Sequence, residues 1–222
     1  MITRVFLAAR RQDMTTDACL QHWRGHHAAI GARLPGVRAY VQNHGVLDGG
    51  RFLLPYPGFD IMPELDWDDL AAMDAAIDSP VHERDSVDDE ANFIDTSRTG
   101  LAVTKRHVLV DGASGGVEAV KLITFLRRAP AASEKDFHDV LLGGYASAIA
   151  GSRPVRHEVL ITIQDRPDRQ PFSAQAIDLL WFESARDALA WTASEPAYIA
   201  AWQLSGLAFG AERLIARPYK VL

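Results

Sequence analysis

One order of secondary-structure elements occurs twice in this chain of 222 residues, and it restricts the possible folds more than any other feature. Residues 2–110 predict the order strand, helix, strand, strand, helix, strand, and residues 117–222 predict it again. This is the order of the split βαβ, or ferredoxin-like, motif. We therefore predict an α+β protein with two tandem ferredoxin-like domains, 1–110 and 117–222, joined by a Gly-rich linker at 111–116.

The predicted elements have similar lengths in the two halves. The first half predicts strands at 2–10, 37–46, 59–65 and 101–110, and helices at 15–34, 70–77 and 79–93. The second half predicts strands at 117–127, 155–164, 177–183 and 209–221, helices at 133–150, 185–193 and 196–204, and a polar turn at 165–171.

Short residue patterns also recur between the halves, at offsets of 117 or 118 residues. They are Arg10-Arg11 with Arg127-Arg128, Thr16-Asp17 with Ser133-Glu134, and Phe59-Asp60 with Ile177-Asp178. The polar residues Trp23, His26 and His27 have no such counterparts, because Val140, Gly143 and Gly144 stand at the equivalent positions. We therefore expect the second half to keep the frame and lose the polar cluster, which leaves one working site per chain.

Composition and charge disfavour several classes of function. The net charge is −6, and no basic stretch alternates with aromatic residues, so we expect neither nucleic acid nor an anionic membrane as a partner. No apolar run has the length of a membrane span, and the N-terminus lacks the pattern of a signal peptide. The single cysteine, Cys19, allows no intrachain disulfide, which fits a cytoplasmic protein. No phosphate-binding loop or nucleophile elbow occurs, which disfavours nucleotides and serine hydrolysis.

Residues 20–44 hold four of the eight histidines and are the predicted site. His27 lies one helical turn after Trp23 on an apolar stripe, and histidine suits acid–base chemistry near neutral pH. The alternative is a core histidine that is satisfied by a backbone carbonyl or by Asn43.

His26 and His27 are consecutive, so their side chains point about 100° apart around an ideal helix. The two imidazoles should therefore not share one small site. Cys19, His22 and His26 fall near one face, but their spacing matches no zinc signature and no carboxylate is close in sequence. We expect no metal and no cofactor.

The strand at 37–46 separates the remaining candidates by parity, because alternate side chains point to opposite faces. Asn43 shares a face with Val41, and this apolar face should meet the helices, next to His27. Tyr40 and His44 should then point away from the helices, either as a proton-transfer pair or as a polar lining between two sheets.

Asp60 is predicted to bind substrate or to be structural. Its recurrence as Asp178 in the half without the polar cluster favours structure, with a salt bridge to Arg38 or Arg156. The acidic run Asp88-Asp89-Glu90 predicts a solvated helix face.

Three stretches of the first half resemble the EthD family of the dimeric α+β barrel superfamily. They are HWRGHHAAIGARLPGVRAYVQNH, FDIMPELDWDDLAAM, and Ser79-Pro80 with the acidic run that ends in DDEANF. The resemblance covers about residues 2–110, and it makes His27 the motif histidine. Residues 117–222, with AIDLLWFES, are similar to a second, divergent copy.

The resemblance implies two ferredoxin-like sheets packed face to face, here as an intramolecular α+β barrel. This agrees with the need of each sheet to cover its second face. A homodimer of such chains could form through an isologous patch.

The resemblance also implies an enzyme on a small, apolar, aromatic or polyketide-like compound, and the leading hypothesis is a cofactor-independent lyase. His27, His44 and Tyr40 would be catalytic, while Trp23, Asn43 and Asp60 would bind substrate. The alternatives are a cofactor-free, anthrone-type oxygenase and a non-catalytic binding protein of a degradation pathway.

Overall fold

The structure is a computed structural model that describes residues 1–112, 116–164 and 174–222. The first half comprises β1 (Ile2–Arg10), α1 (Thr16–His22), η1 (Trp23–His27), α2 (Ala28–Gly31), β2 (Ala39–Gly45), β3 (Leu47–Asp48), β4 (Arg51–Phe52), β5 (Pro63–Trp67), α3 (Leu70–Ile77), η2 (Val81–Ser86), α4 (Val87–Phe93) and β6 (Ile94–Val110). The second half comprises β7 (Val120–Arg128), α5 (Glu134–Val140), η3 (Leu141–Tyr145), α6 (Ala146–Ile149), β8 (Arg156–Gln164), β9 (Ala176–Phe182), α7 (Ala185–Thr192), α8 (Glu195–Gln203) and β10 (Ala208–Lys220). The elements η1, η2 and η3 are π-helical turns within longer helices.

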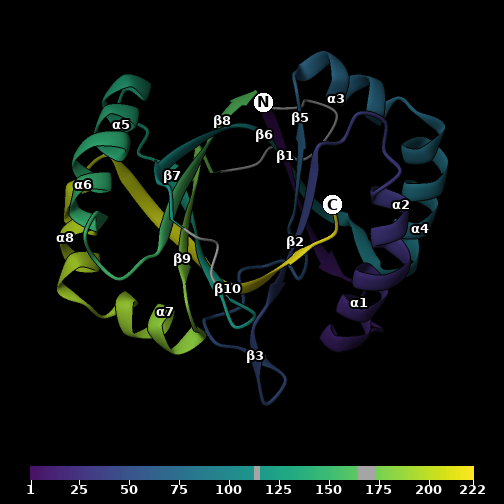
Figure 1. Ribbon diagram of the computed structural model, residues 1–222, viewed down its shortest axis with the longest axis horizontal. Helices are drawn as coiled ribbons and strands as arrows, with labels where there is room; N and C mark the ends of the chain where they lie inside the picture. The colour runs from purple at the N-terminus through teal and green to yellow at the C-terminus, as the bar shows by residue number, and fades with distance from the viewer. Residues whose placement is uncertain (113–115, 165–173) are drawn as a thin grey trace.

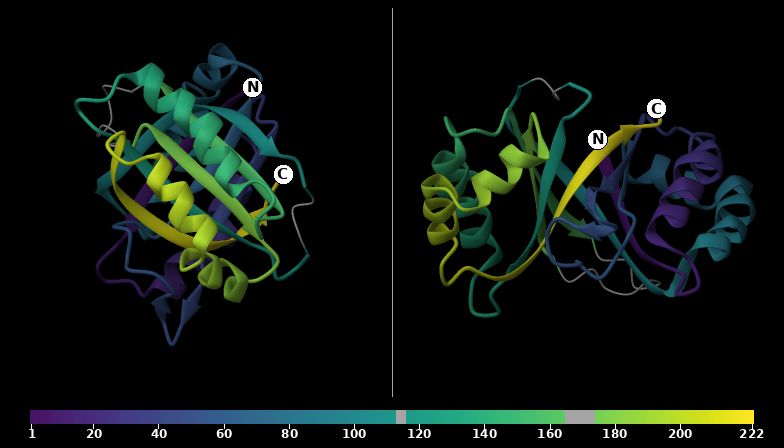
Figure 2. Two further views of the ribbon diagram at one scale, coloured as in Figure 1. Left: turned by 90° about the vertical axis from the view of Figure 1, so that its left-hand side faces the viewer. Right: turned by 90° about the horizontal axis from the view of Figure 1, so that it is seen from below.

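Eight strands form one closed barrel in the order β1-β5-β2-β10-β7-β9-β8-β6. Each half contributes four adjacent strands in the ferredoxin-like order, and the pairs β2–β10 and β6–β8 close the ring. The helices of the two halves cover opposite outer sides of the barrel (Figures 1 and 2). The predicted fold class, two tandem ferredoxin-like repeats in an intramolecular α+β barrel, is therefore confirmed.

Parts of two predicted connections lie outside the described residues. They are residues 113–115 of the proposed linker 111–116, and the whole of the predicted turn 165–171. Among the described residues, every helix falls short of the length or the apolar character that crossing a bilayer requires.

The two halves begin with the same local structure, which fixes their alignment. Thr15 and Ser133 cap the first helix of each half by accepting a hydrogen bond from the backbone N–H three residues later. Arg10 and Arg128 each donate from Nη1 to a carbonyl four residues later, in the turn before that helix. The halves therefore align here at an offset of 118 residues, one more than the sequence pairs predicted.

The predicted correspondence between Asp60 and Asp178 is wrong. The carboxylate of Asp60 accepts from the backbone N–H of Arg10 at 2.9 Å, and the side chain of Gln175 accepts from the N–H of Arg128 at 2.8 Å. Gln175 is thus the counterpart of Asp60. The connection before the third strand differs in length between the halves, so a constant offset misaligns the carboxylates.

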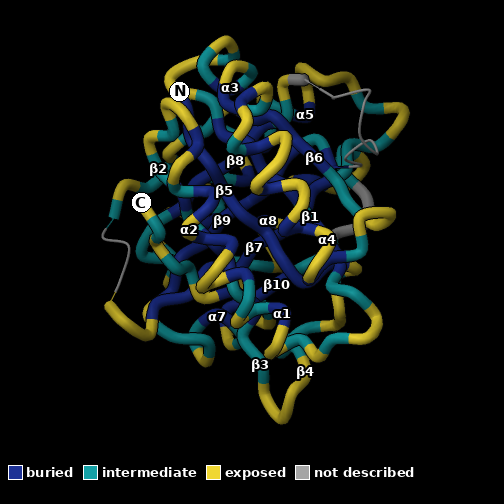
Figure 3. Tube along the Cα trace, turned by 90° about the vertical axis from the view of Figure 1, so that its right-hand side faces the viewer, coloured by how far each residue is buried: buried dark blue, intermediate teal, exposed yellow. Residues whose placement is uncertain are grey.

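The interior of the barrel is part apolar and part ionic. An apolar cluster draws on strands of both halves, including Val5, Met62, Ile123 and Leu179. Figure 3 shows that the strands are buried along most of their length, whereas the β3–β4 hairpin protrudes and is largely exposed.

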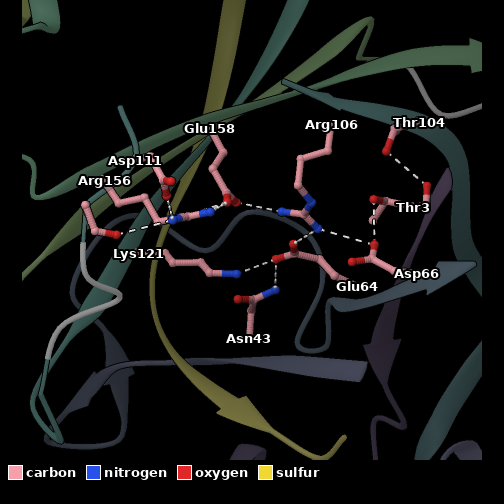
Figure 4. Close-up of polar contacts among 11 residues, drawn as sticks. Thr3, Asn43, Glu64, Asp66, Thr104, Arg106, Asp111, Lys121, Arg156 and Glu158 are labelled. Atoms are coloured by element: carbon pink, nitrogen blue, oxygen red, sulfur yellow. Dashed lines mark hydrogen bonds and ion pairs between the residues drawn. The ribbon is translucent and has the colours of Figure 1, made fainter. Parts of the chain in front are cut away.

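The ionic part of the interior joins the two halves (Figure 4). Glu64 accepts from Lys121 Nζ at 2.6 Å and from Arg106 Nη2 at 2.9 Å, and Arg106 Nη1 donates to Glu158 at 2.6 Å. Glu64 is 3% exposed and Lys121 is 1% exposed. Burial alone would raise the pKa of Glu64, but the charges of Lys121 and Arg106 lower it to about 2, so the carboxylate is ionised.

Candidate functional site

The prediction of which side chains of the second strand face the helices is wrong. Three candidate residues, Tyr40, Asn43 and His44, therefore lie on the opposite face of the sheet from the one expected. Tyr40 packs in an apolar cluster beneath the helices of the first half, together with Leu34 and Trp67. Asn43 instead points into the barrel, where its Nδ2 donates to Glu64 Oε1 at 2.8 Å. The prediction assumed that the apolar face meets the helices, but the barrel interior here contains buried ions that require a polar partner.

Tyr40 and His44 are connected through Gln42 in the layer between sheet and helix. Gln42 Nε2 is 2.9 Å from the hydroxyl of Tyr40 and donates to the carbonyl of Trp23 at 2.8 Å. Gln42 Oε1 is 2.9 Å from His44 Nε2, and the His44 ring stacks on Trp23 at 4.6 Å between centroids. Tyr40 and Trp23 are each 1% exposed, so these side chains pack against one another and are closed to solvent.

We expect His44 to make the stability of the protein depend on pH. Burial, followed by the charge of Arg24, lowers its pKa from the usual 6.5 to about 4. The folded protein thus holds the imidazole neutral while the unfolded chain protonates it. The stabilisation is complete above about pH 6.5 and is lost as the pH falls towards 4.

This predicts that about 2 kcal/mol of His44's contribution is lost between pH 7 and pH 5. The His44→Phe variant keeps a ring on Trp23 and should lose less stability over that interval than the wild type. Urea denaturation at both pH values measures the difference. Equal losses in the two proteins would show that His44 does not carry this dependence.

His27 lies between two helices and pairs with Asp89. Its Nδ1 is 2.9 Å from Asp89 Oδ2, and the His22 Nε2 is 2.9 Å from Asp89 Oδ1. His26 Nε2 is 3.6 Å from the same oxygen, so the expectation that His26 and His27 could not share a site is wrong. The residues belong to the π-helical turn η1 and its flank, where the spacing of side chains differs from that of an ideal α-helix.

The prediction of a solvated acidic face also fails at Asp89, which is 5% exposed. Burial lowers the pKa of His27, and the neighbouring Asp89 partly opposes this effect. Within the described ranges, no three His, Cys, Asp or Glu side chains are arranged to hold a metal ion. Through Asp89, the cluster joins α4 to η1.

Asp60 lines a pocket of about 560 Å³ in the first half. The pocket lies between the end of β1, the start of α1 and the β3–β4 hairpin. Its lining includes Arg10, Thr16, Arg51, Phe52, Leu54, Tyr56, Asp60 and Arg98. None of the other five predicted site residues lines it. Its volume suits a small organic molecule.

The carboxylate of Asp60 is held in this pocket by several polar contacts. It accepts from the Tyr56 hydroxyl at 2.7 Å and from the Arg10 backbone at 2.9 Å, and Arg10 Nε lies 3.6 Å away. Thr16 Oγ1 is at 3.5 Å. The predicted salt bridges to Arg38 and Arg156 do not form, because Arg38 pairs with Asp68 and Arg156 with Glu158 and Asp111.

Tyr56 faces this carboxylate and stays protonated. Burial, then the hydrogen bond to Asp60 and its charge, raises the pKa of the phenol above its usual value. The proton of Tyr56 therefore lies between the two residues at neutral pH. The hydroxyl of a bound substrate could donate a hydrogen bond to a free lone pair of the phenol oxygen.

The pocket combines cations with an apolar wall. Arg51 and Arg98 contribute guanidinium groups, and Arg98 Nη2 donates to the carbonyl of Gly58 at 3.4 Å. Phe52 and Leu54 contribute the apolar surface, and the Phe52 ring lies 5.6 Å from that of Tyr56. The arrangement can bind a compound with an apolar body and a negatively charged or developing oxygen.

Apart from Asp60, little in the sequence indicates this pocket. Tyr56 and Arg51 lie in a Gly- and Pro-rich stretch that was predicted as a plain connection, and the short hairpin β3–β4 was not predicted. An aromatic and a basic residue in a loop that leads to a buried carboxylate is the signal that could have found them.

Comparisons with known proteins agree with the topology. Residues 11–97 match the EthD domain family. An anthrone oxidase-like protein of solved structure has a TM-score of 0.68 at 10% identity, covering 99% of this chain and 93% of its own. A candidate monooxygenase from Lactobacillus acidophilus has a TM-score of 0.56 at 11% identity, covering 100% of this chain and 94% of its own.

A mutant chlorite dismutase from Candidatus Nitrospira defluvii is also similar, with a TM-score of 0.54 at 8% identity and a coverage of 99% and 91%. No curated protein matches the chain. At these identities the likeness establishes the fold alone. The similar structures extend over both halves, whereas the family match ends at residue 97, as expected for a tandem chain with a divergent second copy.

Proposed function

We propose that this chain, whose residues 11–97 match the EthD domain family, is an enzyme that acts on a small molecule in the Asp60 pocket. The proposed activity is that of a lyase whose acid–base steps use Tyr56 and Asp60. One observation carries this proposal: a buried carboxylate accepts from the Tyr56 hydroxyl at 2.7 Å, at a pocket of about 560 Å³ that three arginines, Arg10, Arg51 and Arg98, help to line.

The chemistry follows from proton transfer through the phenol. A substrate hydroxyl donates its proton to Tyr56, while Tyr56 passes its own proton to Asp60. The electrons of the broken O–H bond form a carbonyl as the adjacent carbon–carbon bond breaks. The leaving carbon keeps the electrons of that bond and takes a proton back from Asp60 through Tyr56.

The other groups of the pocket suit this reaction. Negative charge develops first on the substrate oxygen and then on the leaving group, and Arg51 and Arg98 can stabilise it. Phe52 and Leu54 can pack against an aromatic or polyketide-like body. Tyr56 remains neutral before and after the step, in agreement with its raised pKa.

The residues that were expected to be catalytic have other proposed roles. His27 with Asp89 would hold α4 in place, while Tyr40 and His44, with Trp23 above them, would support the first helix. Asn43 would donate a hydrogen bond to Glu64 in the buried ionic network. Each of them would then act on the pocket only through packing.

The proposal predicts that Tyr56→Phe and Asp60→Asn each lower kcat/KM by about 10²-fold or more, because each breaks the proton path. The assay uses small aromatic β-hydroxy ketones and follows the aromatic aldehyde released by carbon–carbon cleavage. Tyr219→Phe is the matched control, since Tyr219 does not line the pocket, and it should keep wild-type turnover. Wild-type turnover in both pocket variants would disprove the assignment.

A cofactor-free oxygenase is the second candidate, and the likeness to an anthrone oxidase-like protein and a candidate monooxygenase favours it. The Tyr56–Asp60 pair would then take a proton from an acidic C–H group of the substrate, and the resulting carbanion would react with dioxygen. An oxygen electrode separates the two, because only the oxygenase consumes oxygen in proportion to substrate. Saturable binding without either product would instead identify a binding protein.

A further inference from the structure

The second half has a pocket of its own, although its sequence predicted that the polar cluster was lost. The pocket measures about 400 Å³ and lies between α8, η3 and the strands β7 and β10. Its lining includes Thr124, Tyr145, Trp191, Tyr198, Trp202 and Arg213. It shares no lining residue with the Asp60 pocket.

A buried polar group forms one wall of this pocket. Tyr145 is the last residue of the π-helical turn η3, as His27 is of η1, so a phenol takes the place of the imidazole. The Tyr145 hydroxyl donates to Asp178 Oδ2 at 2.7 Å, and Asp178 Oδ1 is 2.7 Å from His157 Nε2. Tyr145 lines the pocket, whereas Asp178 and His157 are fully buried behind it.

The hydrogen-bond network of Tyr145, Asp178 and His157 is incomplete. The Nδ1 atom of His157 is buried and has no hydrogen-bond partner in the part of the chain that the structure describes. An imidazole nitrogen that is buried without a hydrogen-bond partner costs free energy in a packed core. Its cost is understandable where the phenol orients a ligand.

Arg213 supplies a positive charge at the same pocket. It is half-buried on β10, and among the described residues no carboxylate forms an ion pair with its guanidinium. Arg213 and Tyr145 both line this pocket. A half-buried guanidinium that forms no direct ion pair with a described residue can bind an anionic oxygen.

The rim of the pocket is aromatic and open to solvent. Trp202 is 68% exposed and Tyr198 is 72% exposed, both on α8, while Trp191 lies deeper at 4%. Exposed aromatic rings beside a cation are typical of a binding surface for a flat ligand.

We propose that this pocket is a second ligand site, which binds a small aromatic carboxylic acid. The carboxylate would pair with Arg213 and the ring would pack against Trp202. A hydroxyl on the ring would donate to the free lone pair of Tyr145. Complementarity of charge and shape supports this ligand over a neutral aliphatic one, since the pocket has one cation and several aromatic rings.

Calorimetric titration of the full chain with benzoate and 4-hydroxybenzoate tests the proposal. We expect saturable binding of both, with cyclohexanecarboxylate at least threefold weaker. Arg213→Met should weaken benzoate binding at least tenfold, and Trp202→Ala should weaken it and abolish any fluorescence quenching by the ligand. Tyr145→Phe should weaken 4-hydroxybenzoate more than benzoate.

Two controls distinguish this site from the Asp60 pocket. Arg33→Met changes an exposed arginine of the first half, and Asp60→Asn changes the other pocket, so both should bind benzoate like the wild type. Circular dichroism checks that each variant is folded. The proposal is wrong if no saturable binding occurs, or if Arg51→Met loses binding while Arg213→Met keeps it. Loss of turnover in Asp60→Asn with intact benzoate binding would support both sites separately.

Discussion

Replacing Lys121 with methionine is expected to lower the free energy of unfolding by about 3–5 kcal/mol. Lys121 is 1% exposed, and its Nζ lies 2.6 Å from Glu64 Oε1 inside the barrel. The variant leaves the buried Glu64 carboxylate with Arg106 and Asn43 only. A buried ion that loses one of its counter-ions keeps its desolvation cost without the matching attraction.

Urea denaturation measures this effect, and two variants make it specific. Glu64→Leu combined with Lys121→Met removes both charges, so it should recover part of the stability that Lys121→Met loses. Lys135→Met is the matched control, because Lys135 forms an ion pair with Asp139 on the surface of α5. It should unfold at the wild-type urea concentration. A Lys121→Met variant as stable as Lys135→Met would show that the interior pair contributes nothing.

Trp23→Ala is expected to cost about 3–5 kcal/mol, as other Trp-to-Ala changes in cores do. Trp23 is 1% exposed, packs with Phe6, Ile61 and Phe93, and covers His44 at 4.6 Å. Removing the indole leaves a cavity and admits water to the His44 ring. Thermal and urea unfolding measure the loss.

A second readout separates this packing role from a general loss of stability. Opening the layer above His44 should raise its pKa from about 4 towards 6.5, which an NMR titration of the imidazole can follow. Trp202→Ala, at a tryptophan that is 68% exposed, should leave both stability and the His44 titration close to wild type. An unchanged His44 pKa in Trp23→Ala would contradict the contact described here.

The element order could be predicted from the sequence because capping residues and hydrophobic periods agree with the fold. The helix predicted at 70–77 is α3 (Leu70–Ile77), since Asp69 caps it by accepting from the Ala72 N–H. The strand β6 was predicted too short. Its first residues, including Asp95 and Ser97, are polar, and they lie at a shift in register between the pairs Arg10–Ile94 and Ala8–Thr99.

The candidate site was less predictable, because it depends on which face of each strand meets the helices. An apolar face usually marks the core, but this protein has two buried layers, and the interior layer contains ions as well as apolar side chains. Asn43 and Tyr40 therefore exchanged their expected positions. The π-helical turns also have no clear sequence pattern, so the gathering of His22, His26 and His27 around Asp89 could not be foreseen.

The closing pairs of the barrel have a consequence for how the chain is made. β2 finds its second neighbour only in β10, and the backbone N–H of Val221 donates to the carbonyl of Tyr40 at 2.9 Å. While a ribosome is still extending the chain, the edges of β2 and β6 lack those neighbours, and such open edges invite pairing with other chains. Contacts this distant in sequence also slow folding. Nascent molecules should therefore be prone to such pairing until β10 has left the ribosome.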